Sequence, residues 1–150
     1  MLSLASCKKT QEFRDDYDCA DLLAKAFDKT SAASDYKVLG DEHIKYNFDN
    51  TTLDDDHSFL ASTPTTDISE AGVFHAPNRA IRKELSELAE DYLEDYFEEK
   101  EAFIASYAPQ ELEKLKNAET RVFGNYVVYA ILSDEDRDIF FDTIERLLAE

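Results

Sequence analysis

Residues that could perform chemistry are few in this sequence and stand far apart. The three histidines, His43, His57 and His75, are each isolated, and we interpret them as surface or strand residues. Covalent hydrolysis needs a nucleophile, a base and a group that orients the base. The chain has no G-x-S-x-G segment, no glycine-rich phosphate loop and no pair of histidines at metal-binding spacing. We therefore predict no enzyme, no metal and no cofactor, although a hydrolase built on carboxylates that sequence cannot pair stays open.

A cluster of cations suggests a binding site instead. Arg79, Arg82 and Lys83 fall in the first turns of a long predicted helix, whereas residues 84–101 are strongly acidic. This order opposes the helix dipole, which favours anions at the N-terminus. We hypothesise that Arg79, Arg82 and His75, together with the helix N-terminus, bind a small anion or a partner carboxylate. The alternative is that these cations pair with acidic residues elsewhere on the surface.

Two acidic segments could hold a cation. Asp54-Asp55-Asp56-His57 offers carboxylates that hard cations prefer, but it lacks the glycine and the spaced ligands of a calcium loop. Further carboxylates form a stripe along the long predicted helix. We interpret both segments as solvated surface, with a divalent-cation or basic-partner site as the alternative for the stripe. The stripe consists of Glu87, Glu90, Asp91, Glu94, Asp95 and Glu98.

The N-terminal segment Leu4-Ala5-Ser6-Cys7 has the residues needed for attachment of lipid to a cysteine. It resembles the lipobox of bacterial lipoproteins, in which the cysteine thiol is acylated and becomes the new N-terminus. Two acyl chains are enough for stable anchoring. Three residues precede the box, whereas an export signal needs a basic segment and roughly 7–15 apolar residues, so we infer a misplaced start codon or a trimmed chain. A chance match is the alternative.

The charge of the chain restricts its partners. Acidic residues outnumber basic residues 34 to 16, which gives a formal net charge of −18. Nucleic acids and anionic lipid headgroups repel such a chain, so we predict no nucleic-acid partner and no membrane binding by charge alone. A lipid on Cys7 would overcome that repulsion. The second cysteine, Cys19, lies on an apolar helix face and is expected to be buried.

The hydrophobic pattern predicts one α+β domain. We divide the chain into a signal remnant (1–7), a polar tether (8–16) and a single domain (17–150). A domain of this size needs no disulfide or metal in order to fold. Apolar spacing, caps and proline positions define the expected elements. These are a helix at 18–29, strands at 36–39, 44–48, 71–76 and 126–132, a surface loop at 49–66, and helices at 78–107, 109–118 and after Ser133. We expect a small, mostly antiparallel sheet of three to four strands packed by about four helices.

Short motifs in the second half are similar to a known family. They are Glu70-Ala-Gly-Val-Phe74, Tyr107-Ala-Pro109-Gln-Glu-Leu-Glu-Lys-Leu-Lys-Asn-Ala118 and Gly124-Asn125-Tyr126-Val127. They resemble domain-of-unknown-function family 4358, found in small lipoproteins of Gram-positive bacteria, over roughly residues 16–135. The resemblance implies an extracytoplasmic lipoprotein and no particular activity.

The matched residues also have structural roles. Pro109 suits a helix start, Gly124 a bulge or close approach at the start of a strand, and Asn125 a backbone hydrogen bond beside Tyr126.

Two functions follow from these observations. The first is a lipid-anchored extracytoplasmic domain that binds an unknown small ligand or protein without catalysis. The second is a cytoplasmic acidic interaction protein, either a nucleic-acid mimic or the partner of a basic protein, whose natural start is Met1.

Overall fold

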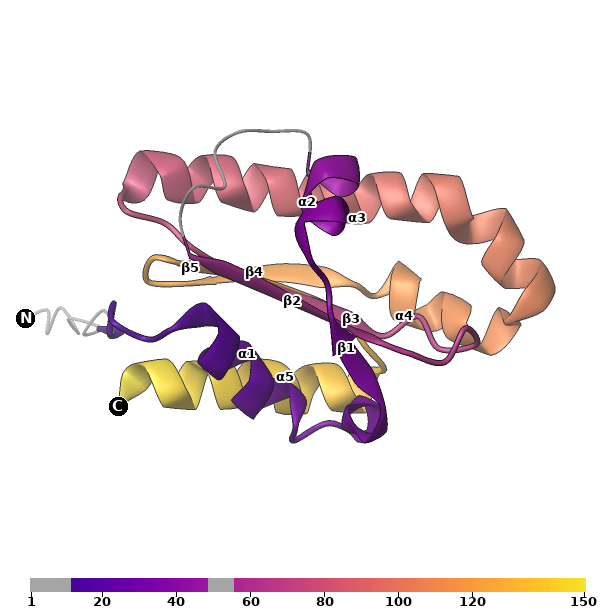
Figure 1. Cartoon of the computed structure of the whole chain (residues 1–150), viewed down its shortest axis with the longest axis horizontal. Coiled ribbons are helices and arrows are strands. Elements are labelled where there is room, and N and C mark those ends of the chain that lie inside the picture. Colours follow the sequence, from indigo (N-terminus) through magenta and orange to yellow (C-terminus); the bar gives the residue numbers. More distant parts are fainter. Residues whose placement is uncertain (1–11, 49–55) are drawn as a thin grey trace, which may run out of the picture.

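A computed structural model describes residues 12–48 and 56–150. These residues form three layers, with a sheet between two layers of helices (Figure 1). Within the described part there are five α-helices and five strands, so the predicted α+β class is confirmed. Cys7, Asp54 and Asp55 lie outside the described residues.

The sheet is antiparallel throughout, with the strand order β1-β2-β3-β5-β4. β5 lies between β3 and β4, and each of its six residues is buried. This confirms the strand predicted at 126–132. Its aromatic and β-branched residues do not alternate with polar ones, because both faces of the strand are covered. The strands are β1 (Tyr36–Val38), β2 (His57–Ser62), β3 (Glu70–His75), β4 (Glu119–Phe123) and β5 (Tyr126–Ile131).

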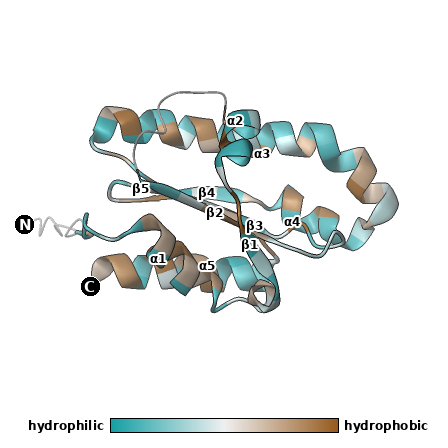
Figure 2. Cartoon of the chain, viewed as in Figure 1, coloured by the Kyte–Doolittle hydropathy of each residue, from teal (hydrophilic) through white to brown (hydrophobic). Residues whose placement is uncertain are grey.

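Each face of the sheet has its own core. Helices α1 (Cys19–Phe27) and α5 (Asp134–Ala149) cover one face, where Tyr126, Val128 and Ala130 of β5 join their cluster. Helix α3 (Arg79–Tyr107) covers the other face, where Val127 and Tyr129 join a second cluster with Leu85 and Ala89. The two sets alternate along β5, as side chains of a strand must. Hydrophobic and hydrophilic residues also alternate along α3 (Figure 2).

Local signals fixed the helix ends as expected. The Asn78 side chain accepts a hydrogen bond from the Ile81 amide at 3.0 Å and starts α3. The Ser133 hydroxyl accepts one from the Asp136 amide and starts α5. Helix α3 ends at Tyr107, just before Pro109 opens a 3-10 turn (Pro109–Glu111) that leads into α4 (Leu112–Lys116). Capping of this kind satisfies amides that have no partner within the helix.

Three expectations about the sheet were wrong. The segment at 44–48, predicted as a strand, belongs to helix α2 (Asp41–Asn47). Ile44 and Phe48 are four residues apart, a spacing that puts them on one side in a strand and in a helix alike. The predicted loop at 49–66 contains β2, and the edge strand β4 was missed because only Phe123 in it is buried.

Candidate functional site

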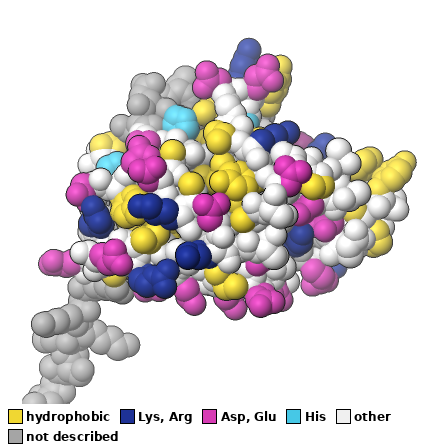
Figure 3. All heavy atoms as spheres, turned by 60° about the horizontal axis from the view of Figure 1, so that its bottom comes forward, with side chains coloured by type: hydrophobic (Ala, Val, Ile, Leu, Met, Phe, Trp, Pro, Cys, Tyr) yellow, Lys and Arg dark blue, Asp and Glu magenta, His cyan; other side chains and the backbone are white. Residues whose placement is uncertain are grey.

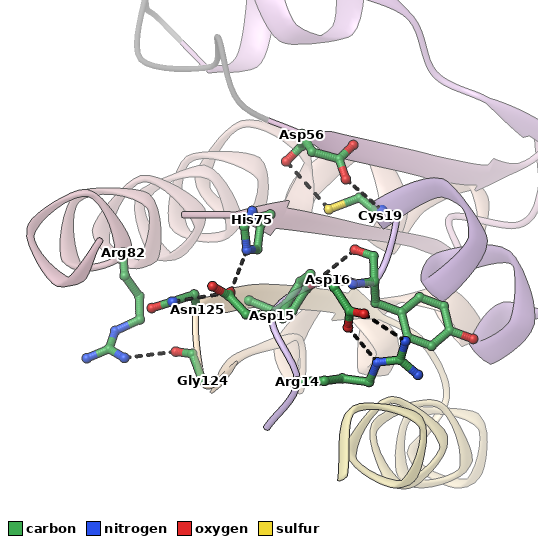
Figure 4. A network of polar contacts seen from close by, with 11 residues as sticks. Arg14, Asp15, Asp16, Cys19, Asp56, His75, Arg82, Gly124 and Asn125 are labelled. Carbon is green, nitrogen blue, oxygen red and sulfur yellow. Dashed lines mark hydrogen bonds and ion pairs between the residues drawn. The ribbon is translucent and has the colours of Figure 1, made fainter. Parts of the chain in front are cut away.

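The segment that precedes α1, residues 12–18, lies against the domain and is called the N-terminal lead here (Figure 4). The Asp15 carboxylate accepts hydrogen bonds from His75 Nε2 at 2.6 Å and from Asn125 Nδ2 at 3.2 Å. The contact with His75 lowers the pKa of Asp15 below its ordinary value. His75, at the end of β3, therefore positions the lead.

Backbone contacts strengthen this docking. The Tyr126 hydroxyl donates to the Tyr17 carbonyl at 2.7 Å and accepts from the Tyr17 amide at 2.8 Å. The Arg14 amide donates to the Leu148 carbonyl at 2.8 Å. The ring of Phe13 packs edge-on against Phe123. Residues 12–16 were expected to belong to a polar tether, and three of them, Phe13, Arg14 and Asp15, contact the domain.

Arg79 and Arg82 lie together, as hypothesised, and His75 is not with them. Both arginines and Lys83 line a hollow of about 930 Å³ between the start of α3 and the β4–β5 hairpin, called the Arg79 hollow here. Phe13 and Val122 provide apolar lining. His75 does not line this hollow.

The cations of the Arg79 hollow differ in their partners. Arg82 donates to the Gly124 carbonyl at 2.8 Å, and Lys83 Nζ lies 3.9 Å from Glu87. Arg79 is exposed and has no partner among residues 12–48 and 56–150. Of these three cations, only Lys83 therefore pairs with an acidic side chain in the described structure. Anion binding at Arg79 and Arg82 stays a hypothesis.

The family-like motifs occupy structural positions. Gly124 has a φ of +60°, which favours glycine, and with Asn125 it forms the two-residue turn between β4 and β5. Gly124 thus lies in a turn that leads into β5, and the expected close approach is made there by Phe13, whose Cβ would lie 3.1 Å from a Cβ at this position. Tyr126 is buried beneath the N-terminal lead, and Pro109 opens its 3-10 turn.

Asp56 and Cys19 form a structural contact. The Cys19 amide donates to the Asp56 carboxylate at 2.8 Å, and the thiol lies 3.5 Å from the Asp56 carbonyl oxygen. Cys19 is fully buried, and this burial raises the pKa of its thiol. The described part of the acidic segment thus satisfies the first amide of α1, and the thiol stays protonated.

A second site was missed by the sequence analysis. Glu70 begins β3 with its carboxyl group buried between the sheet and α3, where Oε2 accepts hydrogen bonds from the Tyr92 and Tyr129 hydroxyls, both at 2.7 Å. Burial raises the pKa of Glu70 to about 7, although the two tyrosine hydrogen bonds oppose this rise. Burial likewise raises the pKa of Tyr92 and of Tyr129, so both hydroxyls remain donors.

His43 lies beside this carboxyl group, not at the surface. Its side chain is 10% exposed, and its ring packs against Phe48, Phe59 and Tyr92 at centroid distances of 5.4, 5.1 and 5.7 Å. Burial lowers the pKa of His43 to about 4, so the ring is neutral at pH 7. Asn47 Nδ2 lies 3.1 Å from Nδ1, which places the proton on Nε2. That Nε2 is 3.8 Å from Glu70 Oε2 and is buried without a hydrogen-bond partner in the described part of the chain.

A hollow opens over these two groups. It has a volume of about 230 Å³ and is called the Glu70 hollow here. An adjoining hollow of about 460 Å³ shares His43, Glu70, Tyr96 and Lys100 with it and is also lined by Ser62, whose buried hydroxyl has no partner in the described structure. The Glu70 hollow is lined by His43, Tyr46, Asn47, Glu70, Tyr92, Asp95, Tyr96, Glu99 and Lys100.

The acidic stripe has no single location. Asp95 lines the Glu70 hollow, whereas Glu87 pairs with Lys83 near the start of α3. Acidic side chains are spread over the face shown in Figure 3, with basic and hydrophobic side chains between them. Within residues 12–48 and 56–150, no three His, Cys, Asp or Glu side chains are placed to hold a metal ion.

Comparison with protein-family models, with characterised proteins and with solved structures yields no match. The resemblance to family 4358 therefore stays a prediction. None of the described helices is both long enough and apolar enough to cross a membrane.

Proposed function

We propose that this protein is a lipid-anchored, extracytoplasmic domain that binds a small molecule without catalysis. The observation that carries the binding role is the Glu70 hollow. It contains a buried carboxyl group without a cationic partner in the described structure and a buried histidine Nε2 without a hydrogen-bond partner there. Buried polar groups normally have partners, so these two groups support a role in which a partner arrives from outside.

Binding is preferred to catalysis because of the contacts that two of the three histidines make. His75 bonds the Asp15 carboxylate, and His43 contacts the Asn47 amide. Neither contact activates a nucleophile, which in covalent catalysis is hydrogen-bonded to its base. A catalytic function would need a base that is hydrogen-bonded to a nucleophile instead.

The anchored location is supported by the segment Leu4-Ala5-Ser6-Cys7 and by the resemblance to family 4358. The cytoplasmic interaction protein is the competing proposal. A lipid on Cys7 would place the acidic domain at a membrane whose anionic headgroups repel it. Docking of residues 12–18 then sets which end of the domain lies nearest the membrane.

Metabolic labelling with a clickable fatty acid tests the anchor in cells that express the natural gene product. We expect label on the wild-type protein and on a Cys19→Ala variant, and none on Cys7→Ala. Cys19→Ala is the matched control because it removes the other cysteine of the chain. An unlabelled wild-type protein would favour the cytoplasmic alternative.

A further inference from the structure

We propose that the Glu70 hollow binds a small organic cation with a primary ammonium group, which pairs with the Glu70 carboxylate. This inference rests on the proposed function only in assuming that the domain binds a small molecule. It does not depend on the lipid anchor.

The charges that line the hollow favour a cation. Glu70, Asp95 and Glu99 supply three carboxyl groups, and Lys100 supplies one ammonium group. Hydrogen-bond acceptors therefore exceed charged donors around the hollow. A positively charged ligand complements the three carboxyl groups, because an ammonium group has three donors. The Nε2–H of His43 needs an acceptor, which the rest of the ligand has to supply.

Among the residues that the structure describes, none supplies a cation to the Glu70 carboxyl group. The carboxylate accepts hydrogen bonds from the neutral hydroxyls of Tyr92 and Tyr129, and His43 Nε2 lies too far away, at 3.8 Å, to donate one. An ionised carboxylate in so buried a place is costly unless an opposite charge offsets it. A ligand ammonium group would supply that charge.

Aromatic rings around the hollow also suit a cation. Tyr46, Tyr92 and Tyr96 line it, and the last two pack edge to face with ring centroids 5.9 Å apart. The negative face of an aromatic ring attracts cations at short distance.

The size and spacing of the lining restrict the cation further. A volume of about 230 Å³ lies below the range of roughly 300–1,000 Å³ that is common for drug-sized ligands, so a molecule of few heavy atoms fits. Among the described residues no three acidic or histidine side chains converge tightly enough for a metal. Carboxylates spread around a hollow can still surround a larger organic ion.

NMR titration of the purified full chain tests the proposal with two probes of equal shape, n-butylammonium chloride and n-butanol. The titration is run at pH 8, above the pKa of Glu70, in about 0.15 M KCl to screen diffuse attraction to the acidic surface. We expect saturable amide shifts in residues 43–47 and 92–100 with the amine, and at least tenfold weaker binding of the alcohol.

A Glu70→Gln variant identifies the group responsible. Its amide oxygen can still accept from both tyrosine hydroxyls, so the change removes the charge and keeps those bonds. We expect at least tenfold weaker binding of n-butylammonium to Glu70→Gln, and unchanged binding to Glu90→Gln, the matched control on the exposed side of α3. If Glu70→Gln does not fold, Glu99→Gln at the exposed rim should still weaken binding several-fold.

Three results of the amine and alcohol titrations would overturn the inference. They are equal affinity for amine and alcohol, equal affinity of wild type and Glu70→Gln, and no saturable shift in the hollow with the amine. A neutral polyol such as erythritol that binds in place of the amine would also overturn it, while leaving small-molecule binding intact. Failure of Cys7 labelling would instead affect only the proposed anchor.

Discussion

The Glu70 hollow and the Arg79 hollow both border helix α3, yet their charges have opposite surroundings. The Glu70 carboxyl group is buried and held by two tyrosine hydroxyls. Arg79 and Lys83 are exposed, and Arg82 reaches a backbone carbonyl of the hairpin. The Glu70 hollow therefore holds one titratable group inside the fold, whereas Arg79 and Lys83 of the other hollow lie at the surface.

This difference determines how strongly each hollow indicates a binding function. An exposed cation is solvated by water and contributes little to stability, so Arg79 needs no special explanation. A buried carboxyl group is retained at a cost that its hydrogen bonds only partly offset. The Glu70 hollow therefore points more strongly to a ligand, although the basic cluster is more conspicuous in the sequence.

Two glycines allow the packing beneath the two hollows to be compared directly. A Cβ at Gly72 would collide with the ring of Tyr129 and would lie 2.6 Å from Phe59. Gly124→Ala would instead strain a φ of +60° and bring Cβ to 3.1 Å from Phe13. We expect Gly72→Ala to lower the free energy of unfolding by about 3 kcal/mol and Gly124→Ala by about 1 kcal/mol.

Urea unfolding at pH 7 measures both values. Gly40→Ala is a suitable control because a Cβ there meets no atom within 4 Å. A larger loss for Gly124→Ala than for Gly72→Ala would mean that the β3–β5 packing beneath Glu70 is looser than described.

Burial of Glu70 predicts a specific dependence of stability on pH. The pKa of Glu70 is raised from 4.5 to about 7, so the folded protein holds this proton more tightly than the unfolded chain. The resulting stabilisation is complete below pH 4.5 and is lost as pH rises through 7. It amounts to about 3 kcal/mol. Wild type should therefore lose stability relative to Glu70→Gln across this window.

The groups that face Glu70 do not obscure this difference. Tyr92, Tyr96 and Tyr129 have pKa values raised above 10 and do not titrate in the window. His43 has a pKa lowered to about 4, so it reduces stability as pH falls from 6.5 to 4, in the opposite direction. Because His43 is present in both proteins, its contribution cancels to first order. If the difference in the free energy of unfolding between wild type and Glu70→Gln stays constant from pH 4.5 to 8, that result would contradict the burial of Glu70.

Sequence reasoning succeeded for elements whose signals are local. Asn78 and Ser133 cap helices within three residues of the amides they bind, so their roles follow from neighbouring residues. The spacing of Ile44 and Phe48 fits a strand and a helix equally. Packing of these residues against distant strands favours the helix. Strand β2 was missed for the same reason, since its pairing with β1 and β3 is not encoded within it.

The Glu70 hollow could not be predicted because its members are distant in the chain. Tyr92 and Tyr129 are 22 and 59 residues from Glu70. The helix that holds Tyr92 and the strand that holds Tyr129 were predicted, but neither pattern shows that the two hydroxyls share one carboxylate. The one available signal was a glutamate at the start of a buried strand. For the same reason His75 was wrongly predicted to lie with Arg79 and Arg82, since its partner Asp15 is 60 residues away in the chain.

The cations of the Arg79 hollow should contribute less to stability than the residues around the Glu70 hollow. Arg82→Ala removes the hydrogen bond to the Gly124 carbonyl and should lower the free energy of unfolding by about 1 kcal/mol. Arg79→Ala, the matched control on the same helix turn, should change it by less than about 0.5 kcal/mol. Equal losses in urea unfolding would show that Arg79 has a structural partner too.

The smallest expected effect is anion binding at the Arg79 hollow, because its cations are exposed and anions there compete with water and salt. In an NMR titration with sodium phosphate at low ionic strength, we expect weak, saturable shifts of the Arg79 and Arg82 amides. The His75 amide should not follow them, because the His75 ring is held by Asp15 outside the hollow. Arg79→Ala should abolish the shifts with little change in stability. No shift at either arginine would leave the Glu70 hollow as the binding site that the charges of this protein favour.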